Sequence, residues 1–378
     1  MNIGIFTDTY YPEVNGVANS TYVLKKGLEK RGHKVYIFTV TNPEVKRNTE
    51  KNVIRVTSVP FIFMKERRLG WPLYRYIKKR VIKLKLDLVH TQTEFAMGHI
   101  GRRMSEYLKI PHIHTYHTIY EDYTHYLKIP GNKGFKGIIR RFSRHCCENA
   151  DMVIVPTEKV EKLLRNYRVD KKIEVIPSGI NLNKFLTPDE SKVNNLLNKY
   201  RLEDKNVLIY VGRISKEKNI AQVIDYFNKL DDEEAIFLVV GDGPELPELK
   251  KRVEKYKLKN SIIFTGMVPW TEVENYYALG DIFVSASTSE TQGLTYAEAL
   301  ASGLPLLVKS DDCLENVLIY GKNGIGFNSC EEFVQGYHNL IKYKNNAEYI
   351  KNIRQSILSL ASDSFAEKVE HAYKEVLN

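Results

Sequence analysis

Short runs of β-branched and aromatic residues alternate along the whole chain with segments whose apolar side chains recur every three to four positions. This alternation is typical of parallel sheets that are covered by helices on both faces. The runs predicted as strands are NIGIFT, KVYIFTV, LDLVHT, HIHTYH, DMVIVP and IEVIP, followed by NVLIYVG, AIFLVVG, SIIFTG, DIFVSAS and PLLVKS. Because the runs form two successive series, we expect two α/β domains, each with its own parallel sheet.

The stretch from Pro177 to Asn181 is the best candidate for a boundary between the two series, because turn residues there directly follow a predicted strand. A chain of 378 residues is also long enough for two hydrophobic cores. We therefore predict one domain over residues 1–178 and a second over residues 179–360. The last segment, residues 361–378, has the pattern of an amphipathic helix whose apolar side is formed by Phe365, Val369, Tyr373 and Val376.

Charge is distributed unevenly along the chain. Residues 1–180 contain 33 Lys and Arg against 17 Asp and Glu, whereas residues 181–378 contain 23 against 29. The basic first half favours an anionic partner, either a lipid surface or a nucleic acid, although a basic solvated surface has the same composition. No run approaches the roughly 18 apolar residues of a membrane span, and the first residues, MNIGIFTDTY, resemble a buried strand more than a secretory signal. We expect a cytosolic protein.

The segment SETQGLTYAEALASGLP carries the strongest local pattern. Glu290 closes the turn after a predicted strand, and Glu298 lies inside a helix that begins near Gly293. Gly293 allows the backbone to approach a ligand, and the free N–H groups of a first helical turn suit a diphosphate. A carboxylate further along that helix can accept hydrogen bonds from ribose hydroxyls. The plain alternative is a pair of solvated glutamates near a helix end.

Two further segments follow predicted strands at the edge where parallel sheets bind ligands. In YVGRISKEKNI, Arg213 and Lys218 suit the phosphates of a nucleoside diphosphate, because Arg can fork onto phosphate oxygens and Lys adds a compact charge. In TDTYYPEVNGVANS, Gly16 can place its amide against the same group. Taken alone, the first pair fits a solvated loop and Gly16 fits an ordinary turn.

His117 comes just after the predicted strand HIHTYH, where an imidazole can polarise or position a hydroxyl near neutral pH. Three other histidines nearby weaken the case for His117 by itself. None of them has the carboxylate or cysteine neighbours of a metal site, and the four cysteines of the chain have no metal-ligand spacing. We predict no metal.

Taken together, the order and spacing of these segments resemble the retaining glycosyltransferases of the two-domain GT-B architecture, in glycosyltransferase family 4, which includes sucrose and glycogen synthases. The likeness covers essentially the whole chain. The Glu-x7-Glu motif of the family matches Glu290 and Glu298, and its GR…K element matches Gly212, Arg213 and Lys218. Its amino-terminal glycine loop matches Gly16, and its histidine matches His117.

This resemblance implies two facing Rossmann-like domains with the sugar donor in the cleft between them, and a final helix over residues 361–378 that returns to the first domain. It implies that Glu290 holds the donor hexose, Glu298 the ribose, and the main chain around Met267 and Val268 the base. The implied catalytic residues are His117, Glu290, Arg213 and Lys218. The implied donor-binding residues are Gly16, Gly212, Arg213, Lys218, Met267, Val268, Glu290, Gly293, Leu294, Thr295 and Glu298.

A narrower resemblance concerns the acceptor. The segments NGVANSTYVL, HTQTEFAMGHIGRR, HTYHTIYEDYTHYL and ETQGLTYAEAL look like those of bacterial 1,2-diacylglycerol 3-α-glucosyltransferases. Gln292 stands where an aromatic residue is common in the larger family, and the lipid-modifying subgroup often has this glutamine. The resemblance implies transfer of glucose from UDP-glucose to diacylglycerol with retention of configuration, without a bound cofactor or required metal. The sequence shows no pair of carboxylates arranged for double displacement, so we expect front-face attack with the departing diphosphate as base.

A basic segment independently favours a lipid partner, because residues 61–86 hold nine Lys and Arg against one Glu. From Pro72 onward the apolar residues line one helical face, which suits the headgroup zone of an anionic membrane but equally suits packing onto the first sheet. A peripheral association with the inner face of the cell membrane is the expected location. The predicted membrane-binding residues are Arg67, Arg68, Trp71, Arg75, Lys78, Lys79 and Lys83.

Other functions also fit parts of the sequence. Within the same class, the alternative is a mannosyl or galactosyl transferase acting on phosphatidylinositol, on a glycolipid or on a soluble acceptor. A sugar-nucleotide epimerase uses the same architecture, but the match to Glu290 and Glu298 argues against it. A basic nucleic-acid-binding protein is the non-enzymatic alternative, and the sequence has no recognised nucleic-acid module. The hexose, the number of sugars added and the oligomeric state are left open by the sequence.

Overall fold

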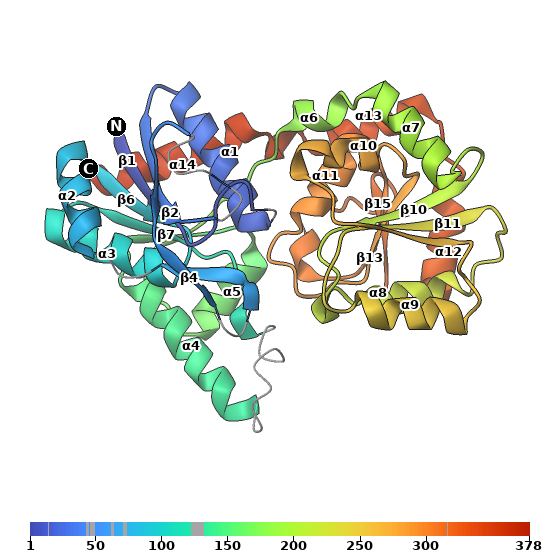
Figure 1. Ribbon diagram of the computed structural model, residues 1–378, viewed down its shortest axis with the longest axis horizontal. Helices are drawn as coiled ribbons and strands as arrows, with labels where there is room; N and C mark the ends of the chain where they lie inside the picture. Colours follow the sequence, from blue (N-terminus) through green and yellow to red (C-terminus); the bar gives the residue numbers. More distant parts are fainter. Residues whose placement is uncertain are drawn as a thin grey trace. The chain divides into compact units, whose positions relative to one another are not determined.

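The computed structural model describes residues 1–13, 15–42, 45, 50–61, 64–70, 74–121, 132–315 and 317–378. These residues divide into two compact units (Figure 1). Unit 1 comprises Met1–Gly179 together with Ser362–Asn378, and unit 2 comprises Ile180–Ala361. Each unit is built on one parallel sheet, as the sequence predicted.

The sheet of unit 1 has seven parallel strands in the order β3-β2-β1-β6-β7-β8-β9. The strand order reverses at β1, which pairs with β2 on one side and β6 on the other, so the crevice beyond the carboxyl ends of β1 and β6 is the place where such sheets bind ligands. The strands are β1 Asn2–Phe6, β2 Lys34–Val40, β3 Val53–Val56, β6 Leu88–Thr91, β7 His112–Thr115, β8 Met152–Val155 and β9 Ile173–Val175.

Helices cover this sheet, and a separate antiparallel hairpin of β4 and β5 lies in the same unit. Almost every residue is buried in four of the strands, β1, β6, β7 and β8, because both faces of the sheet are covered. The remaining elements of unit 1 are α1 Gly16–Lys30, β4 Ser58–Phe61, β5 Met64–Gly70, α2 Tyr74–Leu84, α3 Ala96–Leu108, α4 Asn132–Glu148, α5 Glu158–Asn166 and α14 Ser362–Leu377.

The C-terminal helix α14 packs against α1 and forms part of the core of unit 1 (Figure 1). Phe365, Val369 and Tyr373 of α14 are buried in one hydrophobic cluster with Leu24 of α1 and with strand residues. The helices approach closely at Gly27, where an added Cβ would lie 2.5 Å from the Cβ of Ala366. Helix α14 therefore belongs to the core of unit 1 even though unit 2 precedes it in the sequence.

Unit 2 has a six-stranded parallel sheet in the order β12-β11-β10-β13-β14-β15, with its switch point between β10 and β13. Alternate residues of β10 enter the two clusters on the two faces of the sheet: Ile209 packs on one side and Leu208 on the other. The strands are β10 Asn206–Val211, β11 Ala235–Val240, β12 Ile262–Gly266, β13 Ile282–Ser285, β14 Leu306–Lys309 and β15 Gly324–Phe327.

Two groups of helices cover the faces of this sheet, and Figure 1 shows α8 and α9 on one side and α10 and α11 on the other. The helices are α6 Leu182–Leu186, α7 Glu190–Tyr200, α8 Ile220–Phe227, α9 Leu246–Lys255, α10 Val273–Tyr277, α11 Leu294–Ser302, α12 Cys330–Ile341 and α13 Ala347–Gln355, with 3-10 turns η2 Lys216–Lys218, η3 Trp270–Glu272, η4 Asp312–Leu314 and η5 Leu358–Leu360.

All eleven runs predicted as strands lie in or overlap strands of the structure. The prediction missed the antiparallel pair β4 and β5, the four-residue edge strand β3, and β15, in which two of four residues are glycine. Glycine weakens the strand pattern because it has no side chain to pack. In the part of the chain that the structure describes, no helix combines the length and the apolar character needed to span a membrane.

Candidate active site

The donor-side residues predicted in unit 2 lie at the carboxyl ends of β10 and β13, the two strands that flank the switch point. Gly212 and Arg213 directly follow β10, and Glu290 lies in the loop between β13 and α11. The Nζ atom of Lys218 is 2.6 Å from Oε1 of Glu290, and both side chains are mostly shielded from solvent. The structure therefore brings Lys218 and Glu290 into direct contact across 72 positions of sequence.

Gly293 is required by the shape of the loop that leads into α11. Its φ angle is +70°, and an added Cβ would meet the ring of Tyr296 at 2.4 Å. This turn starts α11 at Leu294, so the main-chain N–H groups of Leu294 and Thr295 lie in the first turn of a nine-residue helix. Such a turn is an anion-binding position, which is the role predicted for this segment.

Glu298 lies one turn further along α11 and is 7% exposed. The hydroxyl of Tyr277 on α10 donates a hydrogen bond of 2.9 Å to its Oε2 atom. Burial raises the pKa of Glu298 to about 7, and the hydrogen bond from Tyr277 and the charge of Lys184 act in the opposite direction. Tyr277 was not predicted from the sequence, because its partner lies 21 positions away on another helix.

A second group that sequence reasoning missed is the glycine loop after β11, with the sequence GDGP. Gly241 has a φ angle of +141°, and an added Cβ would lie 1.9 Å from the carbonyl oxygen of Gly212. The main chain of Ile214 also donates to the carbonyl oxygen of Asp242 at 2.9 Å. These backbone contacts fix the loop that carries Arg213. The sequence did contain a signal for this loop, namely a glycine-rich turn directly after a strongly apolar strand.

Met267 and Val268 follow β12, and the side chain of Met267 is 74% exposed. β12 is separated from β10 by β11 in the sheet, so this segment lies at the same carboxyl edge as Arg213 but two strands away. Lys184 contacts two residues that follow this segment. Its Nζ atom lies 3.5 Å from the ring centroid of Trp270 and 3.4 Å from Oε2 of Glu274.

In unit 1, Gly16 and His117 also lie at the carboxyl edge of their sheet. Gly16 is the first residue of α1, and Asn15 caps this helix by accepting a hydrogen bond from the main chain of Ala18 at 3.0 Å. His117 follows β7, and its Nε2 atom lies 2.7 Å from Oε1 of Gln92. Burial lowers the pKa of His117 to about 3, so the ring is neutral at neutral pH.

Comparison with known proteins decides the family. The model described as Glycosyltransferase Family 4 matches residues 14–184, and that described as Glycosyl transferases group 1 matches residues 193–356. Alpha-monoglucosyldiacylglycerol synthase from Streptococcus pneumoniae is 38% identical over 393 aligned positions that cover the whole chain and 86% of that protein. The protein of the same name from Acholeplasma laidlawii is 37% identical, over the whole chain and 98% of that protein.

The chain belongs to glycosyltransferase family 4. Solved structures of other glycosyltransferases have the same fold. Sucrose-phosphate synthase from Thermosynechococcus elongatus superposes with a TM-score of 0.81 at 20% identity, over 100% of this chain and 99% of that one. Anabaena HepE in complex with UDP and glucose gives a TM-score of 0.78 at 16% identity, over 99% and 100%. The GT-B fold class predicted from the sequence is confirmed.

The residues of this glycosyltransferase that were predicted to bind a membrane lie in or next to β5 and α2. Trp71 lies outside the described residues. Arg67 and Arg68 lie on β5 and Arg75 on α2, where the structure describes the backbone only. Lys79 and Lys83 are exposed on α2, and the Nζ atom of Lys78 lies 3.6 Å from the ring centroid of Tyr107.

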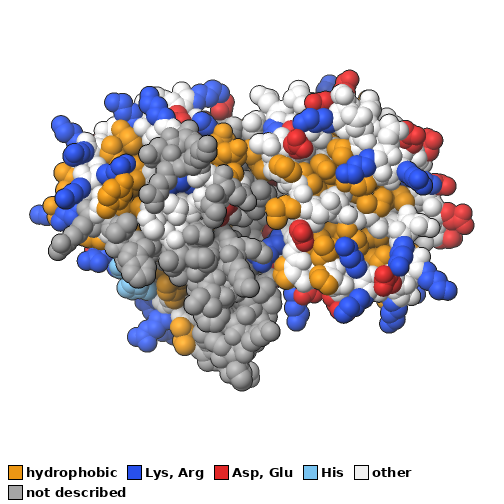
Figure 2. Space-filling model, in the orientation of Figure 1, with side chains coloured by type: hydrophobic (Ala, Val, Ile, Leu, Met, Phe, Trp, Pro, Cys, Tyr) orange, Lys and Arg blue, Asp and Glu red, His pale blue; other side chains and the backbone are white. Residues whose placement is uncertain are grey.

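The apolar face of α2 packs onto the sheet of unit 1. Ile77 and Val81 are fully buried in a cluster with Phe6 and Phe38 of the strands. The opposite face of α2 exposes two apolar side chains, Tyr76 and Ile82, among its cations. In Figure 2 hydrophobic and basic side chains lie next to one another over the part of unit 1 where Figure 1 places α2.

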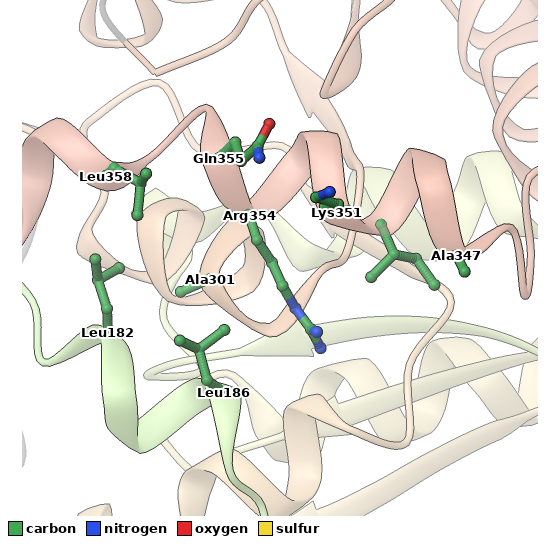
Figure 3. Close-up of a pocket in the computed structure, with 9 residues that line it drawn as sticks. Leu182, Leu186, Ala301, Ala347, Lys351, Arg354, Gln355 and Leu358 are labelled. Atoms are coloured by element: carbon green, nitrogen blue, oxygen red, sulfur yellow. The ribbon is translucent and has the colours of Figure 1, made fainter.

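A pocket of about 420 Å³ lies within unit 2, and its lining includes none of the residues predicted for the donor. Figure 3 shows Leu182 and Leu186 of α6 facing side chains that project from α13 and η5. Arg354 is one of the lining residues, and its guanidinium group donates to the carbonyl oxygen of Ser302 at 3.2 Å. Among the described residues, no group of three or more His, Cys, Asp or Glu side chains is arranged to hold a metal ion.

Proposed function

We propose that this glycosyltransferase transfers glucose from UDP-glucose to the free hydroxyl of 1,2-diacylglycerol with retention of configuration, giving an α-glucosyl diacylglycerol. The observation that carries this proposal is the identity of 37% and 38%, over the whole chain, to two proteins named alpha-monoglucosyldiacylglycerol synthase. The two proteins come from different organisms, and the match extends through both units rather than through one conserved segment.

The proposed donor site combines the unit 2 residues described above. Arg213, Lys218 and the first turn of α11 bind the diphosphate, since they supply cations and free N–H groups at the carboxyl edge of the sheet. Glu290 binds hydroxyls of the hexose, and Glu298 binds the ribose. The ion pair between Lys218 and Glu290 supports this assignment, because a cation and a carboxylate 2.6 Å apart suit neighbouring parts of one ligand.

The proposed reaction occurs on one face of the hexose. The bond between the anomeric carbon and the diphosphate oxygen breaks, the acceptor oxygen bonds to that carbon from the same side, and the acceptor proton moves to the departing diphosphate. Arg213 and Lys218 stabilise the charge that develops on this leaving group. Neutral His117 orients a hydroxyl of the substrate. No protein carboxylate is required as a nucleophile.

We also propose that unit 1 binds the surface of an anionic membrane from its cytoplasmic side. The outer face of α2 supports this, because exposed Tyr76 and Ile82 lie among exposed Lys79, Arg80 and Lys83. Aromatic and aliphatic side chains interleaved with cations are suited to the headgroup region, where each cation contributes about 1 kcal/mol.

The deciding experiment measures UDP release from UDP-glucose by the purified protein, with and without diacylglycerol in anionic vesicles. We expect release to require the lipid, and we expect Glu290→Ala and Arg213→Ala to reduce it by about 100-fold or more. Glu233→Ala, which removes an exposed carboxylate before β11, is the matched control and should retain wild-type activity. The configuration of the product is then read from the anomeric coupling constant by NMR.

The same assay distinguishes the alternatives. Turnover of GDP-mannose or UDP-galactose in place of UDP-glucose would reject the proposed donor. Turnover with phosphatidylinositol or a soluble acceptor in place of diacylglycerol would reject the proposed acceptor. Release of a free sugar without any acceptor would reject transfer as the main activity.

A further inference from the structure

A line of buried polar contacts joins the C-terminal helix α14 to His117. The hydroxyl of Tyr373 lies 2.6 Å from Nδ1 of His90. The amide nitrogen of Gln92 lies 2.9 Å from Nε2 and 3.2 Å from Nδ1 of the same ring, and the amide oxygen lies 2.7 Å from Nε2 of His117. Tyr373 and His90 are fully buried and Gln92 is 2% exposed, so each polar atom depends on its protein partner.

Both histidines in this line are neutral. Burial lowers the pKa of His90 well below its ordinary value and lowers the pKa of His117 to about 3. A neutral imidazole carries its proton on one nitrogen and a lone pair on the other. The position of that proton therefore decides whether the free nitrogen of His117 can accept a hydrogen bond from a ligand or can only donate one.

The amide of Gln92 determines this choice at His117. An amide oxygen only accepts hydrogen bonds, so its contact with Nε2 of His117 requires the proton on Nε2 and the lone pair on Nδ1. The opposite orientation of the amide would put an N–H group against Nε2 and would favour the other tautomer. The tautomer of His117 thus follows the orientation of the Gln92 amide.

Contacts on the far side of Gln92 set that orientation. The amide nitrogen of Gln92 lies close to both ring nitrogens of His90, at 2.9 and 3.2 Å, so its N–H group lies over the electron-rich face of the neutral ring. That face would repel an amide oxygen at the same place. The hydroxyls of Tyr373 and Thr115, each 2.6 Å from a ring nitrogen of His90, hold the ring in this orientation. Loss of the Tyr373 hydroxyl removes the partner of Nδ1 and allows the ring to turn away from the Gln92 amide.

We propose that Gln92 is a positioning residue that holds His117 in its Nε2–H tautomer, and that Tyr373 acts through His90 to orient the Gln92 amide. The lone pair on Nδ1 of His117 then accepts a hydrogen bond from a substrate hydroxyl. This last step rests on the proposed function, whereas the tautomer itself does not. Helix α14 therefore contributes to the site through Tyr373 as well as to the core of unit 1.

The first test measures the tautomer directly in full-length protein labelled with ring-¹⁵N histidine, using long-range ¹H–¹⁵N correlation spectra at pH 8. The signals of His117 are assigned by their loss in His117→Ala. We expect Nε2–H in the wild type and in Gln92→Glu, which keeps an acceptor oxygen. We expect a mixture of tautomers in Gln92→Leu and in Tyr373→Phe.

The matched control is Tyr167→Phe, which removes a tyrosine hydroxyl from the same unit where it donates to Glu121 at 2.7 Å. This variant should keep the wild-type signals of His117. Thermal denaturation is measured for every variant, and Gln92→Leu decides the result if Tyr373→Phe does not fold. Retention of the Nε2–H tautomer in folded Gln92→Leu would overturn the proposal.

The second test is kinetic. We expect kcat for glucosyl transfer to fall about 3- to 30-fold in Gln92→Leu and Tyr373→Phe, with KM for UDP-glucose changed less than twofold, because the loss is one of orientation. A fall in kcat without a change of tautomer would mean a merely structural role and would reject the proposal. If the wild type fails to glucosylate diacylglycerol, the proposed function fails while the tautomer measurement still decides the role of Gln92.

Discussion

Burial of the Glu298 carboxyl group controls the pH at which the proposed ribose contact forms. Its pKa of about 7 means that the group is about half protonated near pH 7 in the absence of a ligand. Ribose hydroxyls donate hydrogen bonds, and an ionised carboxylate accepts them more strongly than a protonated carboxyl group does. Nucleotide affinity should therefore be full above the pKa and should fall as the pH decreases through it, by up to about tenfold per pH unit.

We predict that the Kd for UDP, measured by calorimetry, rises about tenfold or more between pH 8 and pH 5.5. The Glu298→Gln variant should bind more weakly at pH 8 and should lack this component of the pH dependence. The difference between the two proteins at each pH removes the titration of UDP itself. Parallel curves for the wild type and Glu298→Gln would show that Glu298 does not bind the nucleotide as a carboxylate.

Tyr277 provides a second prediction at the same site. Its hydroxyl donates to Glu298 and lowers the pKa of that carboxyl group, so Tyr277→Phe should raise the pKa further. We expect about a 3- to 10-fold loss of UDP affinity at pH 7 and a smaller loss at pH 8.5, since the alkaline solution restores the carboxylate. An equal loss at both pH values would instead indicate disturbed packing of the ring.

At the level of elements, the contact between α1 and α14 depends on the absence of a side chain at Gly27. Alanine is a better helix former than glycine by about 1 kcal/mol, but a Cβ here would overlap Ala366. Overpacking of this kind costs about 1–3 kcal/mol. We therefore predict that Gly27→Ala lowers the free energy of unfolding measured by chemical denaturation, despite its favourable helix propensity.

Gly137 on α4 is the matched control, because an added Cβ there would meet no atom within 4 Å. Gly137→Ala should leave stability unchanged or increase it by up to about 1 kcal/mol. The comparison separates packing from propensity, since both glycines lie inside helices. If the two substitutions had the same effect, α1 and α14 would not be closely packed in solution.

At the level of the whole molecule, the excess of basic residues in the first half predicts that membrane binding depends on unit 1. We expect Lys79→Glu, Arg80→Glu and Lys83→Glu together to reduce binding to anionic vesicles in flotation assays by about 10-fold or more at low salt, because each reversal replaces an attraction by a repulsion. The affinity for UDP should stay within twofold of the wild type.

The control for this prediction reverses three exposed lysines of unit 2, Lys250, Lys251 and Lys255 on α9. This variant has the same change in net charge and should bind vesicles as the wild type does. Equal losses in the two triple variants would mean that net charge matters and that the α2 surface has no special role.

The sequence by itself determined the two series of strands and the residues of the donor-side motifs. Each β-branched run is long enough to specify a strand from its own side chains, and Arg213, Lys218, Glu290 and Glu298 occur in motifs that are read over a few positions. The sequence did not specify β15, where glycine replaces the side chains that carry the strand pattern.

Only the tertiary structure decided which side chains support those motif residues. Tyr277 reaches Glu298 from another helix, and Tyr373 reaches His90 from 283 positions away along the chain. The tertiary structure also decided that Ile77 and Val81 of α2 face the sheet. The physical reason is that periodicity depends on neighbours in sequence, whereas the partner of a buried polar group depends on how distant strands and helices pack together.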